Sequence, residues 1–138
     1  MLTQRVPKLT LTAVPNMFED LVSSIPELVD ANKFKASDYD WALHPGGATI
    51  ISGIQSAMRL TEDHLRASYE VYMAHGNSSS ATFFSVLKQL LSGPTNEHII
   101  GCAFGPGIAV EMMALKRCEL SRSGSASPAE TLVAEDVD

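Results

Sequence analysis

Apolar residues recur at helical spacing in some stretches of the chain and gather into short continuous runs in others. The helical spacing extends over residues 8–29, 50–58, 62–75 and 78–91. The continuous runs, which are typical of buried strands, extend over residues 39–43, 98–103 and 108–115. Alternating residues at 1–6 predict one more short strand. The order of elements therefore predicts a layered α/β domain with a sheet of about four strands.

Turn-forming residues and helix caps divide these elements. Pro15 lies inside the stretch 8–29, so we expect that helix to be kinked or split there. Thr61 is the expected N-cap of the next-to-last helix, and Gly76 its expected end. The segment 104–107 reads Phe-Gly-Pro-Gly and predicts a turn that joins the last two strands as a hairpin.

Composition and charge narrow the class of protein. The chain has 138 residues, of which 45% are hydrophobic and 19% charged, as in a single globular domain. Its formal net charge of −6 argues against binding to nucleic acid. We find no apolar leader after Met1 and no apolar stretch long enough for a membrane span, so we expect a cytoplasmic protein that does not bind membranes. We expect a globular domain over residues 1–118 and a disordered tail, rich in Ser, Ala and acidic residues, over 119–138.

The remaining histidines, cysteines and aromatic residues have ordinary structural interpretations. Cys102 and Cys118 make neither a disulfide framework nor a zinc-binding pattern, so we expect no metal site. We expect both cysteines to be small buried side chains. His64 and His98 are expected on the surface. Phe83 and Phe84 are both expected in the core.

His44 and Asn77 are the candidate catalytic residues. His44 begins the segment His-Pro-Gly-Gly at 44–47, and Asn77 follows Gly76 in Gly-Asn-Ser-Ser-Ser-Ala at 76–81. Each lies at a glycine-flanked junction where a helix should begin. A neutral histidine and an asparagine brought together supply two hydrogen-bond donors for one oxygen, which suits an enolate or a tetrahedral oxyanion. Asn77 has a second interpretation as a helix N-cap.

These segments, in this order, resemble the C-terminal part of a type III polyketide synthase, in the chalcone and stilbene synthase family of the thiolase superfamily. The resemblance covers roughly residues 1–118. It rests on the start of the chain at 2–9, on His-Pro-Gly-Gly, on Gly-Asn-Ser-Ser-Ser-Ala, and on Phe-Gly-Pro-Gly followed by Glu111. Ala103 departs from the family pattern, which usually has a glycine there.

The resemblance implies a fold and a function. The fold would be the C-terminal half of a thiolase-like layer structure, with helices packed on a small mixed sheet. The activity would be that of an acyltransferase, which condenses an acyl-CoA starter with malonyl-CoA by decarboxylation and needs no cofactor beyond these thioesters. His44 and Asn77 match the His and Asn of the family's Cys-His-Asn triad. The pocket would be lined by the residues of the hairpin turn, namely Phe104, Gly105, Pro106 and Gly107.

The family's nucleophilic cysteine belongs to an N-terminal half that this chain does not contain. We therefore expect little synthase activity from the isolated chain. The expected partner is an N-terminal thiolase-like half, or a second copy in a homodimer. An alternative function is a non-catalytic thiolase-like module that acts as a scaffold or as a partner of another chain.

Overall fold

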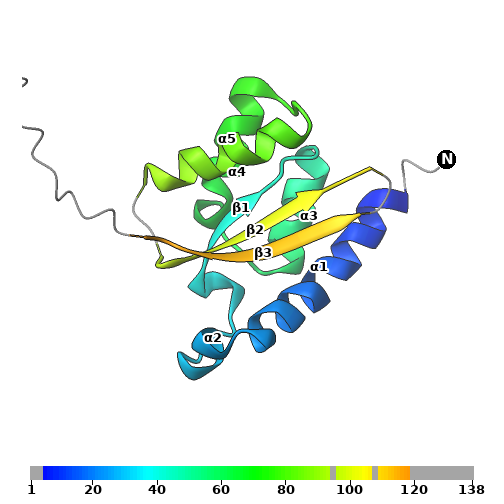
Figure 1. Ribbon diagram of the computed structural model, residues 1–138. Helices are drawn as coiled ribbons and strands as arrows, with labels where there is room; N and C mark the ends of the chain where they lie inside the picture. Colours follow the sequence, from blue (N-terminus) through cyan, green and yellow to red (C-terminus); the bar gives the residue numbers. More distant parts are fainter. Residues whose placement is uncertain (1–4, 94–95, 107–108, 119–138) are drawn as a thin grey trace, which may run out of the picture.

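The computed structural model describes residues 5–93, 96–106 and 109–118. These residues form a small three-stranded sheet with helices packed on both faces (Figure 1). The α-helices are α1 (Arg5–Ser24), α2 (Pro26–Asp30), α3 (Ala48–Ala57), α4 (Arg66–His75) and α5 (Ser80–Leu91). The strands are β1 (Asp40–Leu43), β2 (His98–Phe104) and β3 (Val110–Lys116), and two 3₁₀ turns, η1 and η2, cover Ala36–Asp38 and Asp63–Leu65. The expected α/β class, with helices on a small mixed sheet, is confirmed.

The sheet has the order β1-β2-β3, with a parallel and an antiparallel pairing. β1 runs parallel to β2, and Leu43 is the partner of Cys102 in this register. β2 and β3 form the expected antiparallel hairpin, which closes at the pair Phe104 and Val110. Residues 107–108 of the turn lie outside the described residues. The carboxyl ends of β1 and β2 thus lie at the same end of the sheet, next to this turn.

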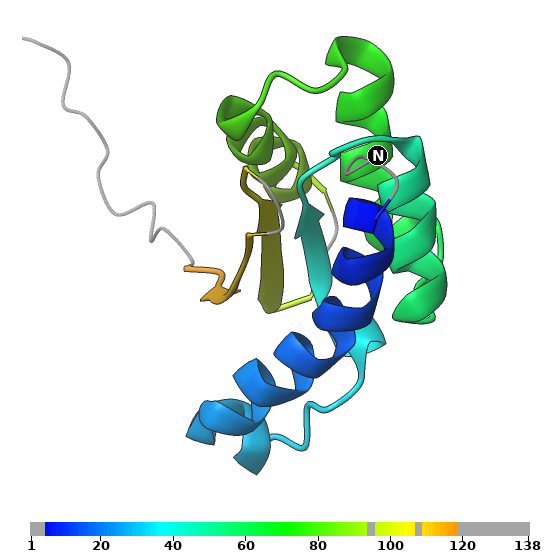
Figure 2. The same cartoon turned by 90° about the vertical axis from the view of Figure 1, so that its right-hand side faces the viewer.

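Alternate residues of the strands enter two separate cores, because successive side chains of a strand point to opposite faces. On one face, Trp41 and Leu43 of β1 pack with α1 and α3. On the other face, Ala42 of the same strand packs with α4 and α5. Figure 2 shows the sheet nearly edge-on, with α1 passing along one side. Buried strand surfaces on both sides agree with the continuous apolar runs in the sequence.

We expected a kink or a split of the first helix at Pro15, and the split is wrong. α1 is assigned as one helix through Pro15, and the break comes at Ile25, which is extended and precedes Pro26. Val14 and Phe18 are buried on either side of Pro15 in the same apolar stripe, and their burial offsets the one hydrogen bond that proline removes. Pro26 instead occupies the first turn of α2, where its missing N–H costs nothing.

The strand expected at residues 1–6 is also wrong where the structure describes it. Arg5 and Val6 belong to α1, and residues 1–4 lie outside the described residues. The described sheet therefore has three strands rather than about four.

Thr61 does not cap α4. A 3₁₀ turn at Asp63–Leu65 precedes the helix, and the Thr61 hydroxyl lies 2.7 Å from Nδ1 of His64. At the other end, Gly76 takes φ +67° and ends α4 as expected, since this backbone conformation favours glycine.

Five side chains expected in the core or on the surface can be compared directly with the structure. Phe83 is buried, but Phe84 is 68% exposed, because consecutive residues of a helix point in different directions. His98, at the start of the central strand β2, is buried rather than on the surface. Cys102 is buried as expected, whereas Cys118 is exposed just beyond β3.

In the part of the chain that the structure describes, no helix is both long enough and apolar enough to pass through a bilayer. The tail expected at 119–138 lies outside the described residues.

Candidate active site

His44 stands at the carboxyl end of β1 and is 5% exposed. Its backbone N–H donates to the carbonyl of Cys102 at 2.8 Å, which continues the β1–β2 ladder by one residue beyond the strand. Its ring lies against Phe104, with the two ring centroids 6.4 Å apart. Pro45 and two glycines then turn the chain into α3, so the imidazole is held at the rim of the sheet.

Asn77 lies in the connection between α4 and α5, next to Gly76. Its Oδ1 accepts the backbone N–H of Ser79 at 2.9 Å, an Asx turn within the connection. α5 begins at Ser80, so Asn77 is not the N-cap that we considered, and Ser79 occupies that position. Ser79 has φ +62° and ψ −142°, a region that non-glycine residues rarely adopt.

The two candidate side chains meet. Nε2 of His44 lies 3.1 Å from Oδ1 of Asn77, although the residues are 33 positions apart in the chain. The Ser79 N–H requires an oxygen at this position, so the amide orientation is fixed. Nε2 must then carry the proton that it donates to Oδ1.

The expectation of two free donors aimed at one oxygen is therefore only partly met by this geometry. The Nε2–H of His44 is engaged with Asn77. The Nδ2 amino group of Asn77 makes no hydrogen bond to any residue that the structure describes and is the free donor. An incoming oxygen would take one N–H from Nδ2 and share the proton of Nε2 with Oδ1.

The pair borders an open pocket of about 480 Å³. Phe104, Gly105 and Pro106, which are three of the four residues expected to line the substrate pocket, lie along its wall. Gly107, the fourth expected residue, lies outside the described residues. Three further lining residues have no role in our sequence analysis: Ile50, Ser79 and Ser80. Ser79 carried no usable signal in the sequence, because one serine among three gives no indication of a strained backbone.

Neither cysteine lies in a position to serve this pair as a nucleophile. Cys102 is fully buried within the core on the α1 face, and burial raises the pKa of its thiol to about 12. A thiol with such a pKa is not a thiolate at neutral pH. Cys118 is exposed beyond the end of β3 and is not among the residues that line the pocket.

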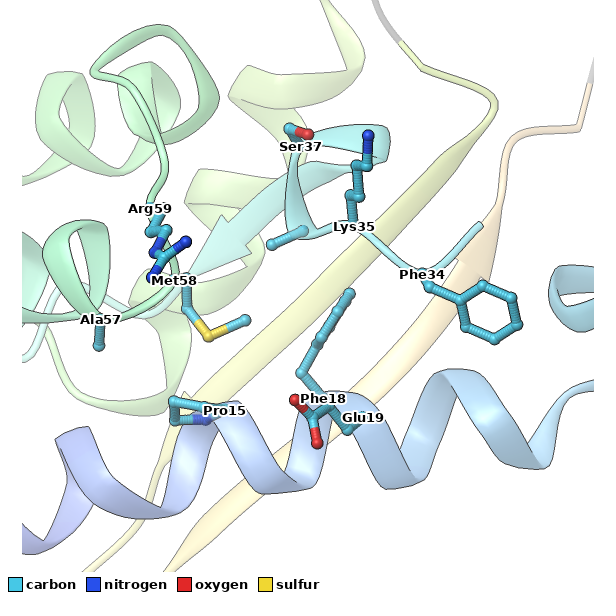
Figure 3. Close-up of a pocket in the computed structure, with 10 residues that line it drawn as sticks. Pro15, Phe18, Glu19, Phe34, Lys35, Ser37, Ala57, Met58 and Arg59 are labelled. Carbon is cyan, nitrogen blue, oxygen red and sulfur yellow. The ribbon is translucent and has the colours of Figure 1, made fainter. Parts of the chain in front are cut away.

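Two other features of the described residues do not form a comparable site. An open pocket of about 480 Å³ lies between α1 and the segments 34–37 and 57–59 (Figure 3), but its charged residues Glu19, Lys35 and Arg59 are exposed. Glu27, Glu97 and His98 gather at the far end of the sheet. There the Lys116 ammonium binds both carboxylates and already occupies the position that a cation would take.

Known proteins match most of this chain. The family model for chalcone and stilbene synthases, C-terminal domain, matches residues 1–119. A type III polyketide synthase of Penicillium soppii is 44% identical over an alignment of 129 residues, and the match covers 86% of this chain and 32% of that protein. An acylalkylpyrone synthase of Aspergillus oryzae is 37% identical over an alignment of 120 residues, and the match covers 83% of this chain and 30% of that protein.

Solved structures show the same relationship. The crystal structure of a type III pentaketide synthase from Neurospora crassa matches with a TM-score of 0.76 and 50% identity, over 83% of this chain and 32% of that one. The chain thus spans about a third of the length of the relatives that it matches.

Proposed function

Because the chain belongs to the chalcone and stilbene synthase family through its match to the C-terminal domain, we propose that it supplies two catalytic groups of a polyketide synthase. The proposed reaction condenses an acyl-CoA starter with malonyl-CoA by decarboxylation. His44 and Asn77 are the proposed catalytic residues, and coenzyme A thioesters are the substrates, with no further cofactor.

The observation that supports this proposal best is the hydrogen bond between His44 and Asn77 at the edge of a pocket. Loss of carbon dioxide from a malonyl thioester leaves an electron pair that is delocalised onto the thioester oxygen. Asn77 Nδ2 and His44 Nε2 would donate to that oxygen as its negative charge grows. A preorganised donor of this kind contributes about 3–4 kcal/mol to transition-state stabilisation.

In the proposed reaction the nucleophilic thiol comes from outside this chain. Two observations support this: Cys102 is buried with a raised pKa, and Cys118 is not among the residues that line the pocket. The acyl group would be carried on that external thiol as a thioester. The enolate carbon would attack the carbonyl carbon of this thioester, and the thiolate would leave. We propose that the thiol belongs to an N-terminal thiolase-like half.

The test is decarboxylation of malonyl-CoA by a protein that carries this chain behind an N-terminal thiolase-like half. We expect His44→Ala and Asn77→Ala each to lower the rate of acetyl-CoA formation about 100-fold or more. His75→Ala is the matched control, since His75 is exposed at the end of α4 and is not among the residues that line the pocket. Unchanged turnover in either site variant rules out the assigned roles.

The isolated 138-residue chain provides a second test. We expect no ketide product when it is incubated with an acyl-CoA and malonyl-CoA. Robust product formation by the chain alone contradicts the proposal that the thiol is external.

A second candidate function is a non-catalytic partner module, which is favoured by apolar side chains left exposed on α4 and α5. Met73 is 81% exposed, Phe84 68% and Leu91 55%. Size-exclusion chromatography of the purified chain, alone and with an N-terminal thiolase-like half, tests this function. A monomer that does not co-elute with that half contradicts it.

A further inference from the structure

Buried polar side chains are few in the part of the chain that the structure describes, and most of them surround the candidate site. They are His44, Ser68, Thr82 and His98. A buried hydroxyl is costly unless it makes a hydrogen bond. Ser68 and Thr82 both make one, and in each case the partner is a backbone group next to a residue of the candidate pair.

Ser68 holds the backbone next to His44. β1 is an edge strand of the described sheet, and the His44 N–H points toward β2. The N–H and the carbonyl of Leu43 itself therefore point away from β2, and the sheet leaves this carbonyl without a partner. The Ser68 hydroxyl, which is fully buried on α4, donates to this carbonyl at 2.8 Å.

Thr82 holds the backbone next to Asn77. Its side-chain oxygen, from the first turn of α5, accepts the N–H of Ser78 at 2.6 Å. Thr82 is 2% exposed, so the acceptor of this bond is buried, whereas its donor belongs to Ser78, an exposed residue. The next N–H along the chain, that of Ser79, is the one that orients the Asn77 amide. The two bonds together fix the connection between α4 and α5 in its strained form.

We propose that Ser68 and Thr82 are positioning residues, which set the distance and orientation of the His44–Asn77 pair through the backbone. Each hydroxyl binds a residue adjacent to one member of the pair, and the two hydroxyls come from helices that pack against each other. A displacement of about 1 Å in such a site costs about 100-fold in rate. Only this catalytic consequence rests on the proposed function.

The geometric claim can be tested by NMR on the 138-residue chain, without any assay of activity. The signals are the side-chain amide of Asn77 and the ring nitrogens of His44, whose shifts report the Nε2–H tautomer. Thr82→Val keeps the shape of the side chain and removes the oxygen. We expect it to shift the Asn77 amide signal and to reduce the Nε2–H tautomer of His44. Ser68→Ala should have the same effect on His44.

Thr82→Ser restores the hydroxyl and should restore both signals. Ser85→Ala is the matched control, because Ser85 is an exposed serine on the same helix that bonds only within it. The proposal is overturned if Thr82→Val and Ser68→Ala lower the stability but leave both signals at their wild-type positions. If Thr82→Val does not fold, the decisive variant is Thr82→Ser, and displaced signals in that folded variant also overturn it.

In the protein that carries this chain behind an N-terminal thiolase-like half, Thr82→Val should lower kcat for decarboxylation about 100-fold with little change in KM. Failure of the NMR prediction refutes the positioning role. If the NMR signals shift as expected but His44→Ala leaves turnover undiminished, the positioning role stands and the proposed function is refuted.

Discussion

Asn77 shows how much of the candidate site depends on one atom. Its Oδ1 accepts two hydrogens, one from the imidazole of His44 and one from the backbone of Ser79. An amide whose oxygen is bound twice cannot rotate freely, so Nδ2 keeps a constant direction. The cost of this arrangement is the positive φ of Ser79, and strain of this kind is tolerated where a site requires it.

The strain at Ser79 predicts that glycine will be better tolerated there than serine. Ser79→Gly keeps the N–H that binds Asn77 and removes the Cβ that opposes φ +62°. We expect the free energy of unfolding to rise by about 1 kcal/mol, as measured by urea denaturation. Ser80→Gly, in the first turn of α5, should instead lower it by about 0.5–1 kcal/mol. Equal losses in both variants contradict the assigned strain.

The two cysteines should differ sharply in reactivity. Burial raises the pKa of Cys102 from 9.0 to about 12, whereas Cys118 is exposed. At pH 8 we expect a thiol reagent to label Cys118 rapidly and Cys102 only upon unfolding, as measured by mass spectrometry. The folded state favours the neutral Cys102 thiol, so its contribution to stability is present below pH 9.0 and is lost as the pH rises toward 12.

Cys118→Ser is the control for this experiment, because the folded variant should have no rapidly labelled thiol. Rapid labelling of Cys102 in the folded chain contradicts the assigned burial, and it also removes one argument for an external nucleophile.

Among the helices and strands, the sequence predicted those that local patterns of apolar and turn-forming residues specify. The helices around Ile54, Val71 and Val86 and the hairpin after Phe104 follow directly from apolar spacing and turn residues. The helix is not split at Pro15, because tertiary burial of the neighbouring residues outweighs the local effect of proline. The prediction that Phe84 lies in the core was wrong, because its helix is covered on one face only and the sequence alone does not show which face.

The sequence pointed to His44 and Asn77 as candidates because both stand in recognisable motifs, and the structure brings their side chains together. It did not point to the residues that hold the backbone next to them. Ser68 and Thr82 carry no such signal, because a serine or threonine in a helix is common and the backbone groups that they bind lie elsewhere. Ser68 binds a carbonyl 25 residues away, and only the folded chain brings them together.

The crossing of α1 and α3 gives a prediction at this scale. A Cβ on Gly53 would lie 2.6 Å from Cδ2 of Leu11, which is too close for both to remain in place. Alanine is a better helix former than glycine by about 1 kcal/mol, yet we expect Gly53→Ala to lower the free energy of unfolding by about 1–2 kcal/mol. Denaturant titration measures the change.

Leu11→Ala should relieve the clash, so the double variant should show a favourable coupling of about 1 kcal/mol. Ser52→Ala, at an exposed position of the same helix, should change stability by less than about 0.5 kcal/mol. A stabilising Gly53→Ala contradicts the close approach of the two helices.

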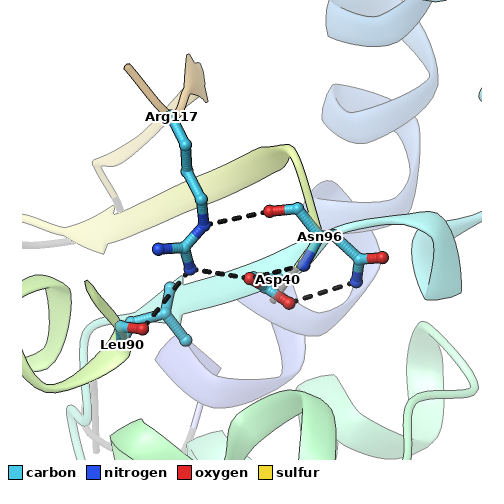
Figure 4. A network of polar contacts seen from close by, with 4 residues as sticks. All are labelled: Asp40, Leu90, Asn96 and Arg117. Carbon is cyan, nitrogen blue, oxygen red and sulfur yellow. Dashed lines mark hydrogen bonds and ion pairs between the residues drawn. The ribbon is translucent and has the colours of Figure 1, made fainter. Parts of the chain in front are cut away.

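For the whole molecule, one end of the sheet is held by a polar network that joins distant parts of the chain (Figure 4). Arg117, after β3, binds the carboxylate of Asp40, at the start of β1, at 2.8 Å. Asn96, before β2, donates to the same carboxylate from its backbone and its side chain, both at 3.1 Å. The guanidinium also donates to the carbonyls of Asn96 and Leu90. The three strands and α5 therefore meet at one carboxylate–guanidinium pair.

This network predicts that Arg117 contributes more to stability than an exposed arginine does. The Arg117 and Asp40 side chains are only 17% and 14% exposed, so Arg117→Met leaves a shielded carboxylate without its charge partner. We expect a loss of about 2–4 kcal/mol in the free energy of unfolding, slightly reduced by the remaining solvent access. Arg66, whose pair with Glu70 is 48% and 42% exposed, is the matched control, and Arg66→Met should cost less than about 1 kcal/mol. A double-mutant cycle with Asp40→Asn measures the coupling in Arg117–Asp40 directly, and a coupling no larger than that of the exposed pair contradicts the role given to this network.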